Sequence, residues 1–275
     1  MGNTRWELTG RRLTNQLLSQ IEGSFRDKTN NNIMKKLLID GDMILYRAAF
    51  AAEKETRWDD DIFTVHSDFS DLKDAFTMFI DGLEEILDSD DVSLAFSDRV
   101  TFRHQMNPLY KAHRKQKRTP LGLGALREWA CEEWPIIFWQ NLEADDMLGI
   151  LGSRDREGSI VVSGDKDFAT VPCTWYNFIR DEMRVISEDE ANYAHFSQTL
   201  AGDATDGYFG VPRVGIKTAE KILDKQGVTW EAVMEAYEKA GLSETEALLN
   251  ARMAYILRDG DYNPETTEVK IWTPN

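Results

Sequence analysis

The sequence predicts an α/β protein in which a central, mostly parallel sheet is flanked by helices. Between residues 35 and 187, short apolar or β-branched segments alternate with helical patterns, and beyond residue 187 helical patterns predominate. Strands that alternate with helices are typical of a parallel sheet. We therefore predict a polar N-terminal extension (1–34), an α/β core (35–187) and a C-terminal helical subdomain (188–275).

Each element of this fold has its own signal. The expected strands are short and rich in apolar residues: Lys36 to Asp40, Val92 to Ser97, Ile136 to Gln140 and Ile160 to Ser163. Helical patterns separate them near 70–88, 121–134 and 143–152. The segments TWYNFI and MRVIS, on either side of 180–182, predict a hairpin. Further helices are expected near 188–201, 217–224, 229–240 and 243–257, and a last strand that returns to the core at 268–272.

Composition limits the class of protein. The chain has 275 residues with 42% hydrophobic content, enough for a substantial core, and it contains no apolar run long enough to predict a membrane span. Two scattered cysteines suit a reducing cytoplasm and leave oxygen atoms to hold any metal. The net charge is −16, yet residues 110–118 carry five cations in nine positions. A local basic patch can bind phosphates on an acidic protein, and we assign Lys115, Lys117 and Arg118 to it.

Acidic residues follow the expected strands at their carboxyl ends. Asp40 and Asp42 follow the first strand, Asp98 follows the second, and Asp165 and Asp167 follow the fourth. In open α/β sheets, ligands bind beyond the carboxyl ends of the strands. The sequence therefore predicts that these carboxylates converge at one edge of the sheet.

The segment Leu142-Glu-Ala-Asp-Asp146 adds Glu143, Asp145 and Asp146 just after the third strand. An alternative interpretation of this trio alone is that its negative charge stabilises the start of a helix. Crowded carboxylates repel one another, and they suit a hard divalent cation such as Mg²⁺ or Mn²⁺. Two such ions can bind the attacking and leaving oxygens of a phosphodiester, as in many nucleases.

A glycine-rich turn lies outside the sheet. Asp203 and Asp206 precede a turn from Gly210 to Gly215, and a helix is expected to begin near Lys217. Backbone N–H groups at such a turn and helix start can bind a phosphate without reading a base. An ordinary turn between two helices remains the alternative interpretation.

Taken in order, the motifs DGD, SD, YKAHR, EADD, GDKD, GDATDG and GVPRVGIKTAEKIL resemble those of the 5′ nuclease (flap endonuclease) superfamily. The sequence is most similar to the stand-alone 5′→3′ exonucleases of short-tailed bacteriophages. The resemblance covers about residues 36 to 273. It implies a PIN-like core, a helix-three-turn-helix in the helical subdomain, and hydrolysis of DNA from duplex 5′ ends and flaps. RNA–DNA hybrids are a further expected substrate, and we expect a monomer without membrane contact.

The resemblance also implies roles for individual residues. One Mg²⁺ or Mn²⁺ site would use Asp40, Asp98, Glu143, Asp145 and Asp146, and a second would use Asp165, Asp167, Asp203 and Asp206. The helical clamp over the 5′ end would use Tyr110, Lys111 and Arg114, and Arg47 would lie near the scissile phosphate. On a helix, Lys111 and Arg114 would share a face, and Tyr110 beside them would stack on a terminal base. The turn with Gly210, Gly215 and Lys217 would grip duplex backbone and hold a monovalent cation, although Arg213 replaces a frequent glycine there.

A different enzyme class also fits the first strand. The segment LLIDGD resembles the nucleophile strand of haloacid-dehalogenase-like phosphatases, in which Asp40 would attack phosphate and Asp42 would act as acid or base. That scheme leaves Glu143, Asp145, Asp146 and the glycine-rich turn without a role. Analysis of the products distinguishes the two classes, because one releases nucleotides and the other free phosphate.

Overall fold

The computed structural model describes residues 34–112 and 118–274, and the chain divides into two compact units. One unit contains residues 44–91 and 119–133. The other contains residues 35–43, 92–118 and 134–275, and it holds the whole central sheet. No helix in the described part of the chain is long and apolar enough to cross a membrane.

The sheet confirms the predicted fold class. Its six strands lie in the order β5-β4-β1-β6-β7-β8, and all neighbours are parallel except β7 and β8. Its strands are β1 (Lys36–Asp40), β4 (Val92–Ala95), β5 (Ile136–Ile137), β6 (Ser159–Val162), β7 (Thr174–Asn177) and β8 (Glu182–Val185). The predicted third strand is shorter than expected. The hairpin at 180–182 is present as β7 and β8.

The register of the sheet aligns the strand ends that carry acids. Ile39 of β1 pairs with Leu94 of β4 on one side and with Val162 of β6 on the other. Asp40 pairs with Ala95. The residues that follow β1, β4 and β6 therefore leave the sheet at one edge, because parallel strands in register end together.

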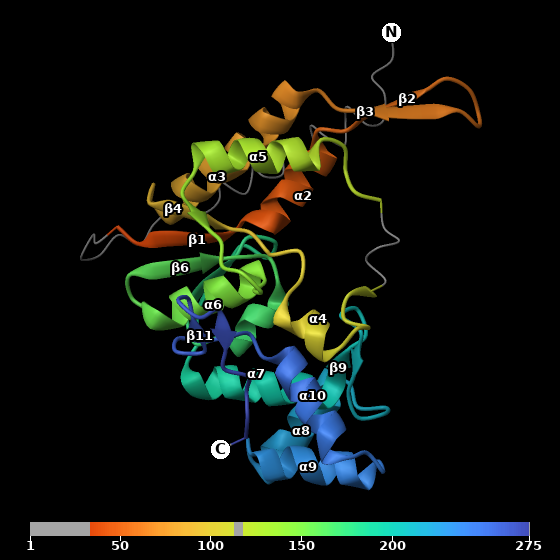
Figure 1. Ribbon diagram of the computed structural model, residues 1–275, viewed down its shortest axis with the longest axis vertical. Coiled ribbons are helices and arrows are strands. Elements are labelled where there is room, and N and C mark those ends of the chain that lie inside the picture. Colours follow the sequence, from red (N-terminus) through yellow and green to blue (C-terminus); the bar gives the residue numbers. More distant parts are fainter. Residues whose placement is uncertain (1–33, 113–117, 275) are drawn as a thin grey trace. The chain divides into compact units, whose positions relative to one another are not determined.

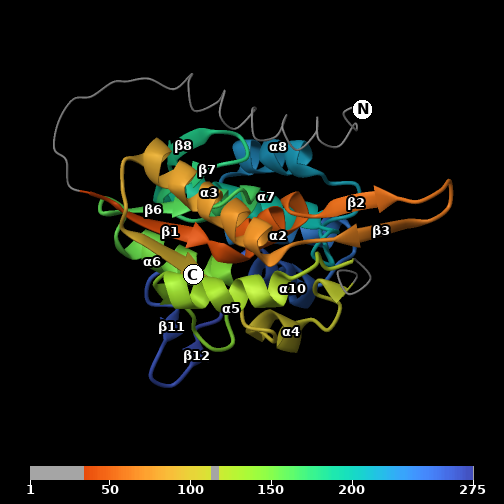
Figure 2. The ribbon, with the colours of Figure 1, turned by 90° about the horizontal axis from the view of Figure 1, so that it is seen from above.

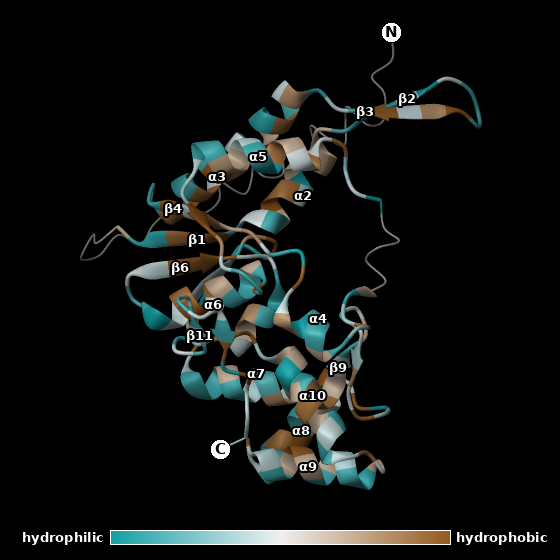
Figure 3. Cartoon of the chain, in the orientation of Figure 1, coloured by the Kyte–Doolittle hydropathy of each residue, from teal (hydrophilic) through white to brown (hydrophobic). Residues whose placement is uncertain are grey.

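The core of this unit lies between the sheet and α6 (Ala144–Arg154), which packs on β1, β4 and β6 (Figure 1). Figure 3 shows hydrophobic residues along most of β1 and β6, as expected for strands buried on both faces. Gly149 and Gly152 allow the close packing of α6. A Cβ atom at Gly149 would lie 2.5 Å from the carbonyl oxygen of Leu257.

The C-terminal part is helical, as predicted. It comprises α7 (Glu188–Ala201), α8 (Ile216–Gln226), α9 (Trp230–Lys239) and α10 (Glu244–Ala254). The Ser187 hydroxyl caps the start of α7 by accepting from the amide of Glu190. An apolar cluster joins the helices through Leu200, Leu223, Val233 and Tyr237.

The chain ends in a short hairpin of β11 (Tyr262–Asn263) and β12 (Glu268–Val269), which is visible in Figure 2. Of the strand predicted at 268–272, only the first two residues are in a strand, and they form β12. Val269 and Trp272 nevertheless pack against the core cluster of this unit. A second small pair, β9 (Gly202–Asp203) and β10 (Tyr208–Phe209), closes the loop after α7.

The other unit contains α3 (Phe69–Leu87) and α5 (Leu123–Glu133), which pack together through Phe76 and Trp129. It also contains the hairpin of β2 (Lys54–Arg57) and β3 (Phe63–His66), which the sequence reading did not predict (Figure 2). Helix α2 (Gly41–Ala51) begins in the sheet unit and continues into this one. The domain boundaries at 34 and 187 stay predictions.

Candidate active site at the carboxyl ends of the strands

Asp40 lies at the end of β1 and is 5% exposed. One carboxylate oxygen accepts a hydrogen bond from the amide of Met43 at 3.0 Å, and the other accepts from the hydroxyl of Ser163 at 2.9 Å. Burial raises the pKa of Asp40 from 3.8 to about 7, and the nearby charges of Asp42 and Asp165 add to the shift. Two neutral donors therefore hold the Asp40 carboxylate in place, but within the described residues no ion pair with a positively charged side chain offsets its negative charge.

Asp145 joins Asp40 from the first turn of α6. Burial raises the pKa of Asp145 well above its usual value, and the negative charges of Asp40 and Asp165 raise it further. Three carboxylates that follow different strands therefore lie close enough to repel one another. The predicted convergence of Asp40, Asp145 and Asp165 at one edge is present in the structure.

The GDKD segment forms a short 3₁₀ helix, η2 (Lys166–Thr170), which Asp165 caps by accepting from the amide of Asp167 at 2.9 Å. Burial raises the pKa of Asp167 to about 7, with a further contribution from the charge of Asp165. The Lys166 ammonium lies 3.3 Å from Asp203 and 4.0 Å from Asp167. Burial alone would raise the pKa of Asp203, but Lys166 outweighs it and lowers that pKa.

Glu143 is compensated by positive charge. It is 7% exposed, and its oxygens accept hydrogen bonds from Arg103 at 3.1 Å, from the hydroxyl of Tyr110 at 2.7 Å and from Lys111 at 2.7 Å. Burial alone would raise the pKa of Glu143, but the charges of Lys111 and Arg103 outweigh it and lower the pKa to about 2.

Asp146 is paired inside the protein in a way that the sequence did not indicate. Its side chain is 0% exposed, and its two oxygens form a bidentate ion pair with Arg103 at 2.6 and 2.7 Å. The same oxygens accept from the amides of Glu143 and Leu257. Because Asp146 is engaged through both oxygens inside the protein, we propose a structural role for it in place of the predicted role as a metal ligand, which stays untested.

Asp98 and Asp206 lie at the margin of the site. Asp98 accepts from the amides of Arg99 at 2.7 Å and Asn141 at 2.9 Å, so it fastens the loop before α6 to the end of β4. Asp206 lies 3.9 Å from the Lys111 ammonium, and its carbonyl accepts from the amide of Lys111 at 3.0 Å. Both roles as metal ligands stay predictions.

No three acidic, histidine or cysteine side chains among the described residues already form a metal site. Several of the carboxylates are bound instead to Arg103, Lys111 and Lys166. The donor set nevertheless fits a hard cation, because Asp40, Asp145 and Asp165 offer buried or half-buried oxygens whose mutual repulsion a cation would relieve.

Comparison with known proteins identifies the family. Residues 35–197 match the family described as "5'-3' exonuclease, N-terminal resolvase-like domain". The matched residues are more than half of the chain. The chain belongs to the 5′-3′ exonuclease family. Members of this family are DNA-hydrolysing nucleases, and this protein is one of them.

Individual relatives agree. The chain is 28% identical over 279 residues to an exodeoxyribonuclease of Enterobacteria phage T3, with 86% of this chain and 92% of the relative covered. It is 29% identical over 282 residues to an exonuclease of Escherichia phage T7, with 86% and 93% covered. The T5 D15 protein, co-crystallised with metal ions, has the same fold, with a TM-score of 0.61 at 15% identity over 80% of this chain and 89% of that chain.

The clamp predicted from Tyr110, Lys111 and Arg114 lies partly outside the described residues. Helix α4 (Phe102–Met106) ends before Tyr110, and Lys111 has a positive φ of 51°. Arg114 is not among the described residues, so the shared helix face of Lys111 and Arg114 stays a prediction. Tyr110 is only 3% exposed and donates to Glu143, which leaves it no surface on which to stack a base. Spacing alone could not indicate the burial of Tyr110, because that burial accompanies its contact with Glu143, 33 residues away.

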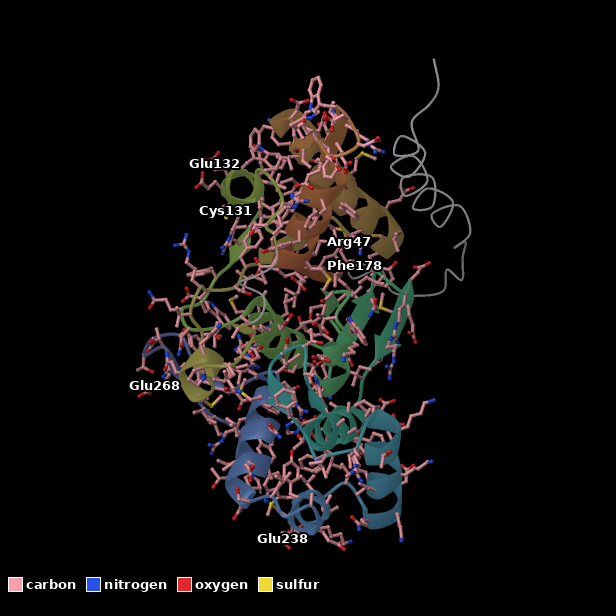
Figure 4. All side chains as sticks on the ribbon, turned by 90° about the vertical axis from the view of Figure 1, so that its right-hand side faces the viewer. Arg47, Cys131, Glu132, Phe178, Glu238 and Glu268 are labelled. Atoms are coloured by element: carbon pink, nitrogen blue, oxygen red, sulfur yellow. The ribbon has the colours of Figure 1, made fainter. Side chains whose placement is uncertain are left out.

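Other predicted DNA contacts are only partly visible. Arg114, Lys115 and Lys117 lie outside the described residues, and Arg118 is exposed. Arg47 lies on the part of α2 that belongs to the other unit, where its guanidinium lies 5.7 Å from the centre of the Phe79 ring (Figure 4). The role of Arg47 stays a prediction.

The glycine-rich turn packs tightly at its start and contains one residue with a left-handed backbone. Gly210 packs so tightly that a Cβ atom would lie 2.2 Å from the carbonyl oxygen of Leu200. Arg213 has a φ of 66°, which favours glycine and explains why this position resembles a glycine site. Gly215 precedes α8, and both Gly215 and Lys217 are exposed. Phosphate and monovalent-cation binding here stay predictions.

Arg103 is the site residue that the sequence reading missed. It is 2% exposed and contacts Asp146, Glu143 and the carbonyl oxygen of Tyr255, at separations of 43, 40 and 152 residues. A single arginine in the segment TFRHQM carries no pattern of its own. The only available signal was the three-acid segment itself, because a buried carboxylate needs a partner.

Proposed function

We propose that this nuclease is a metal-dependent 5′→3′ exonuclease and flap endonuclease that releases 5′-phosphorylated products from DNA. The observation that carries the proposal is the convergence of Asp40, Asp145 and Asp165, where burial raises the pKa of Asp40 and Asp145 and neighbouring negative charges raise it further. Such a cluster costs free energy unless a cation compensates it. The names of the phage relatives support an exonuclease acting on DNA.

Two Mg²⁺ ions are the cofactors that the donor atoms suit, and Mn²⁺ would substitute. One group of ligands comprises Asp40, Asp145 and Glu143, with Asp98 at its margin. The other comprises Asp165, Asp167, Asp203 and Asp206. When bound, the two ions would activate the attacking water and stabilise the leaving oxygen of the phosphodiester. Asp40 is pre-oriented for this role by Met43 and Ser163.

Lys111 is the cation that we place nearest to the reacting phosphate. Its side chain is 15% exposed and lies between Glu143 and Asp206. A cation at this edge stabilises the negative charge that develops on the phosphate in the transition state. We assign positioning of the DNA backbone to Arg114, Lys115, Lys117 and Arg118, to Arg47, and to the turn with Gly210, Gly215 and Lys217.

The substrate range includes duplex 5′ ends, flaps and, by extension, RNA strands paired with DNA. The basic residues and the glycine-rich turn would contact the sugar-phosphate backbone and not the bases, so they would not select a DNA sequence. We propose that the protein acts as a monomer in the cytoplasm of a bacterial host.

A polarity assay tests this proposal. Duplex, flap and RNA–DNA hybrid substrates labelled at one end are incubated with Mg²⁺ or EDTA, and one 5′ end of each duplex is blocked. We expect degradation only from the free 5′ end, only with metal, and with 5′-phosphorylated nucleotides as products. Degradation from 3′ ends would contradict the polarity. Release of free phosphate would indicate the phosphatase class with Asp40 as nucleophile.

A further inference from the structure

Arg103 lies behind the acid cluster and connects three parts of the sheet unit. From α4, its guanidinium binds both oxygens of Asp146 on α6, one oxygen of Glu143, and the carbonyl oxygen of Tyr255 after α10 at 2.6 Å. The side chain is 3% exposed. A planar guanidinium suits this task, because it offers donors in a fixed fork that lysine cannot reproduce.

Glu143 has contacts of two kinds. Through one oxygen it accepts from Lys111, whose side chain is 15% exposed. On its buried side it binds Arg103, which Asp146 and Tyr255 fix in place. If Lys111 turns toward DNA, Arg103 therefore remains the cation that orients Glu143.

Glu143 and Asp146 differ in how Arg103 binds them. Arg103 and Lys111 carry two positive charges, and Glu143 and Asp146 carry two negative charges, with Asp206 a further 3.9 Å from Lys111. Both oxygens of Asp146 accept from Arg103, whereas Glu143 accepts from Arg103 and Tyr110 through one oxygen and from Lys111 through the other. Glu143 therefore keeps one oxygen that Arg103 does not bind. Among the ion pairs of the described residues, none joins Asp40, Asp145 or Asp165 to a buried arginine.

We infer that Arg103 is a positioning residue of the nuclease site, which holds Glu143 from its buried side and ties it to the segment that carries Lys111. This inference rests on the proposed role of Glu143 as a metal ligand. Residues that orient a ligand from behind typically change metal affinity by about 10- to 100-fold when they are replaced. Arg103 thus acts through Glu143 and does not touch the substrate.

Metal binding by the intact protein tests the inference. Binding of Mn²⁺ is measured by electron paramagnetic resonance and calorimetry for wild type, Arg103→Met and Arg103→Lys, and turnover is measured over a range of Mg²⁺ concentrations. We expect Arg103→Met to weaken metal binding about tenfold or more, and excess Mg²⁺ to restore much of the lost turnover. Arg103→Lys should recover only part of the affinity, because it keeps the charge but loses the fork.

Two controls separate positioning from general destabilisation. Arg103→Met leaves the buried Asp146 carboxylate without its ion-pair partner, and the single variant is therefore at risk of not folding. In that case the double variant Arg103→Met with Asp146→Asn is used, because it removes both charges of the pair. Tyr237→Phe removes a buried hydrogen bond to the carbonyl of Thr199 in the helical cluster, and it should leave Mn²⁺ affinity unchanged.

The outcomes are distinguishable. Wild-type protein that binds no divalent metal would contradict the proposed function itself. Wild type that binds Mn²⁺ while a folded Arg103→Met variant, or the neutral double variant, binds it equally well would overturn the role of Arg103. Turnover that falls without any change in its Mg²⁺ dependence would likewise leave Arg103 a purely structural residue.

Discussion

Asp145 and Asp146 are neighbours in the chain but occupy opposite electrostatic environments. Asp145 lies with Asp40 and Asp165, and burial and repulsion raise its pKa. Asp146 lies against Arg103 in a bidentate ion pair and is inaccessible to solvent. Consecutive residues on a helix point about 100° apart, so only one of the two can face the acid cluster. The comparison separates an acid that a buried arginine of the chain compensates from one that lies among other acids.

The largest expected effect is on kcat, and it distinguishes Asp145, a proposed metal ligand, from acids with a structural role. Asp145→Asn should lower kcat by several orders of magnitude, because it removes a proposed metal ligand. It should preserve or raise the free energy of unfolding in EDTA, because it relieves repulsion. Kinetics under single-turnover conditions and urea denaturation provide the two measurements.

The matched control for that variant is Asp155→Asn, at the end of the same helix, where the side chain accepts from the amide of Gly158. Its kcat should stay close to wild type. An Asp145→Asn variant that keeps full activity, or that unfolds in metal-free buffer, would place Asp145 with the structural acids.

Lys111→Ala tests the accessible side of Glu143. It should reduce kcat about 10²- to 10³-fold, equivalent to about 2.7 to 4 kcal/mol of transition-state stabilisation. The affinity for DNA, measured with Ca²⁺ in place of Mg²⁺, should change much less. Lys73→Ala on α3 serves as a control for the loss of one lysine. A normal kcat in Lys111→Ala would remove this lysine from the proposed site.

Lys166→Met tests whether the Lys166 ammonium occupies the position of a metal ion beside the second group of proposed ligands. The ammonium of Lys166 lies 3.3 Å from Asp203, and its side chain is 65% exposed. Because such exposed ion pairs are weak, Mn²⁺ affinity should rise only about two- to fivefold in the variant. Unchanged or weaker Mn²⁺ binding in calorimetry would mean that Lys166 does not compete with metal.

The smallest expected effect is a dependence of metal-free stability on pH. The pKa values of Asp40 and Asp167 are raised from 3.8 to about 7 in the folded chain, so folding takes up protons between about pH 4 and 7. Their contribution to stability is therefore fully present near pH 4 and is lost as the pH rises through 7. The pKa of Glu143 is lowered to about 2, and its contribution disappears only below about pH 4.5.

Urea denaturation in EDTA from pH 4.5 to 7.5 measures this dependence. Relative to Asp167→Asn, the wild-type free energy of unfolding should fall by on the order of 1 kcal/mol over that range. Excess Mg²⁺ should flatten the difference. A wild-type protein that gains stability relative to Asp167→Asn toward pH 7 would show that the acids are already compensated.

Much of the sheet unit could be predicted from the sequence, because its signals are local. Lys36–Asp40 and Glu188–Ala201 begin and end where the patterns indicate. The buried strands form continuous apolar runs, and the Ser187 cap fixes the start of α7. The β2–β3 hairpin was missed because its segments, KETR and FTVH, carry charged and polar residues and lie exposed.

The acid cluster was likewise predictable as a group but not residue by residue. Strand order places Asp40 and Asp165 at one edge, and the aligned register of β1 and β6 confirms that placement. The roles of Asp146 and Tyr110 depend on Arg103 and Glu143, which contact them across 33 to 43 residues of sequence. Such pairings arise from packing, and no spacing rule within one segment reveals them.

The most direct test of the central claim is the position of bound metal. Crystals grown with Mn²⁺ and measured at the manganese absorption edge would locate each ion by its anomalous signal. We expect Mn²⁺ coordinated by oxygens of Asp40, Asp145 and Asp165 or their neighbours in the proposed set, with the Arg103–Asp146 ion pair unchanged. Mn²⁺ bound by Asp146, or no Mn²⁺ at the carboxyl ends of the strands, would contradict the division between compensated and uncompensated acids.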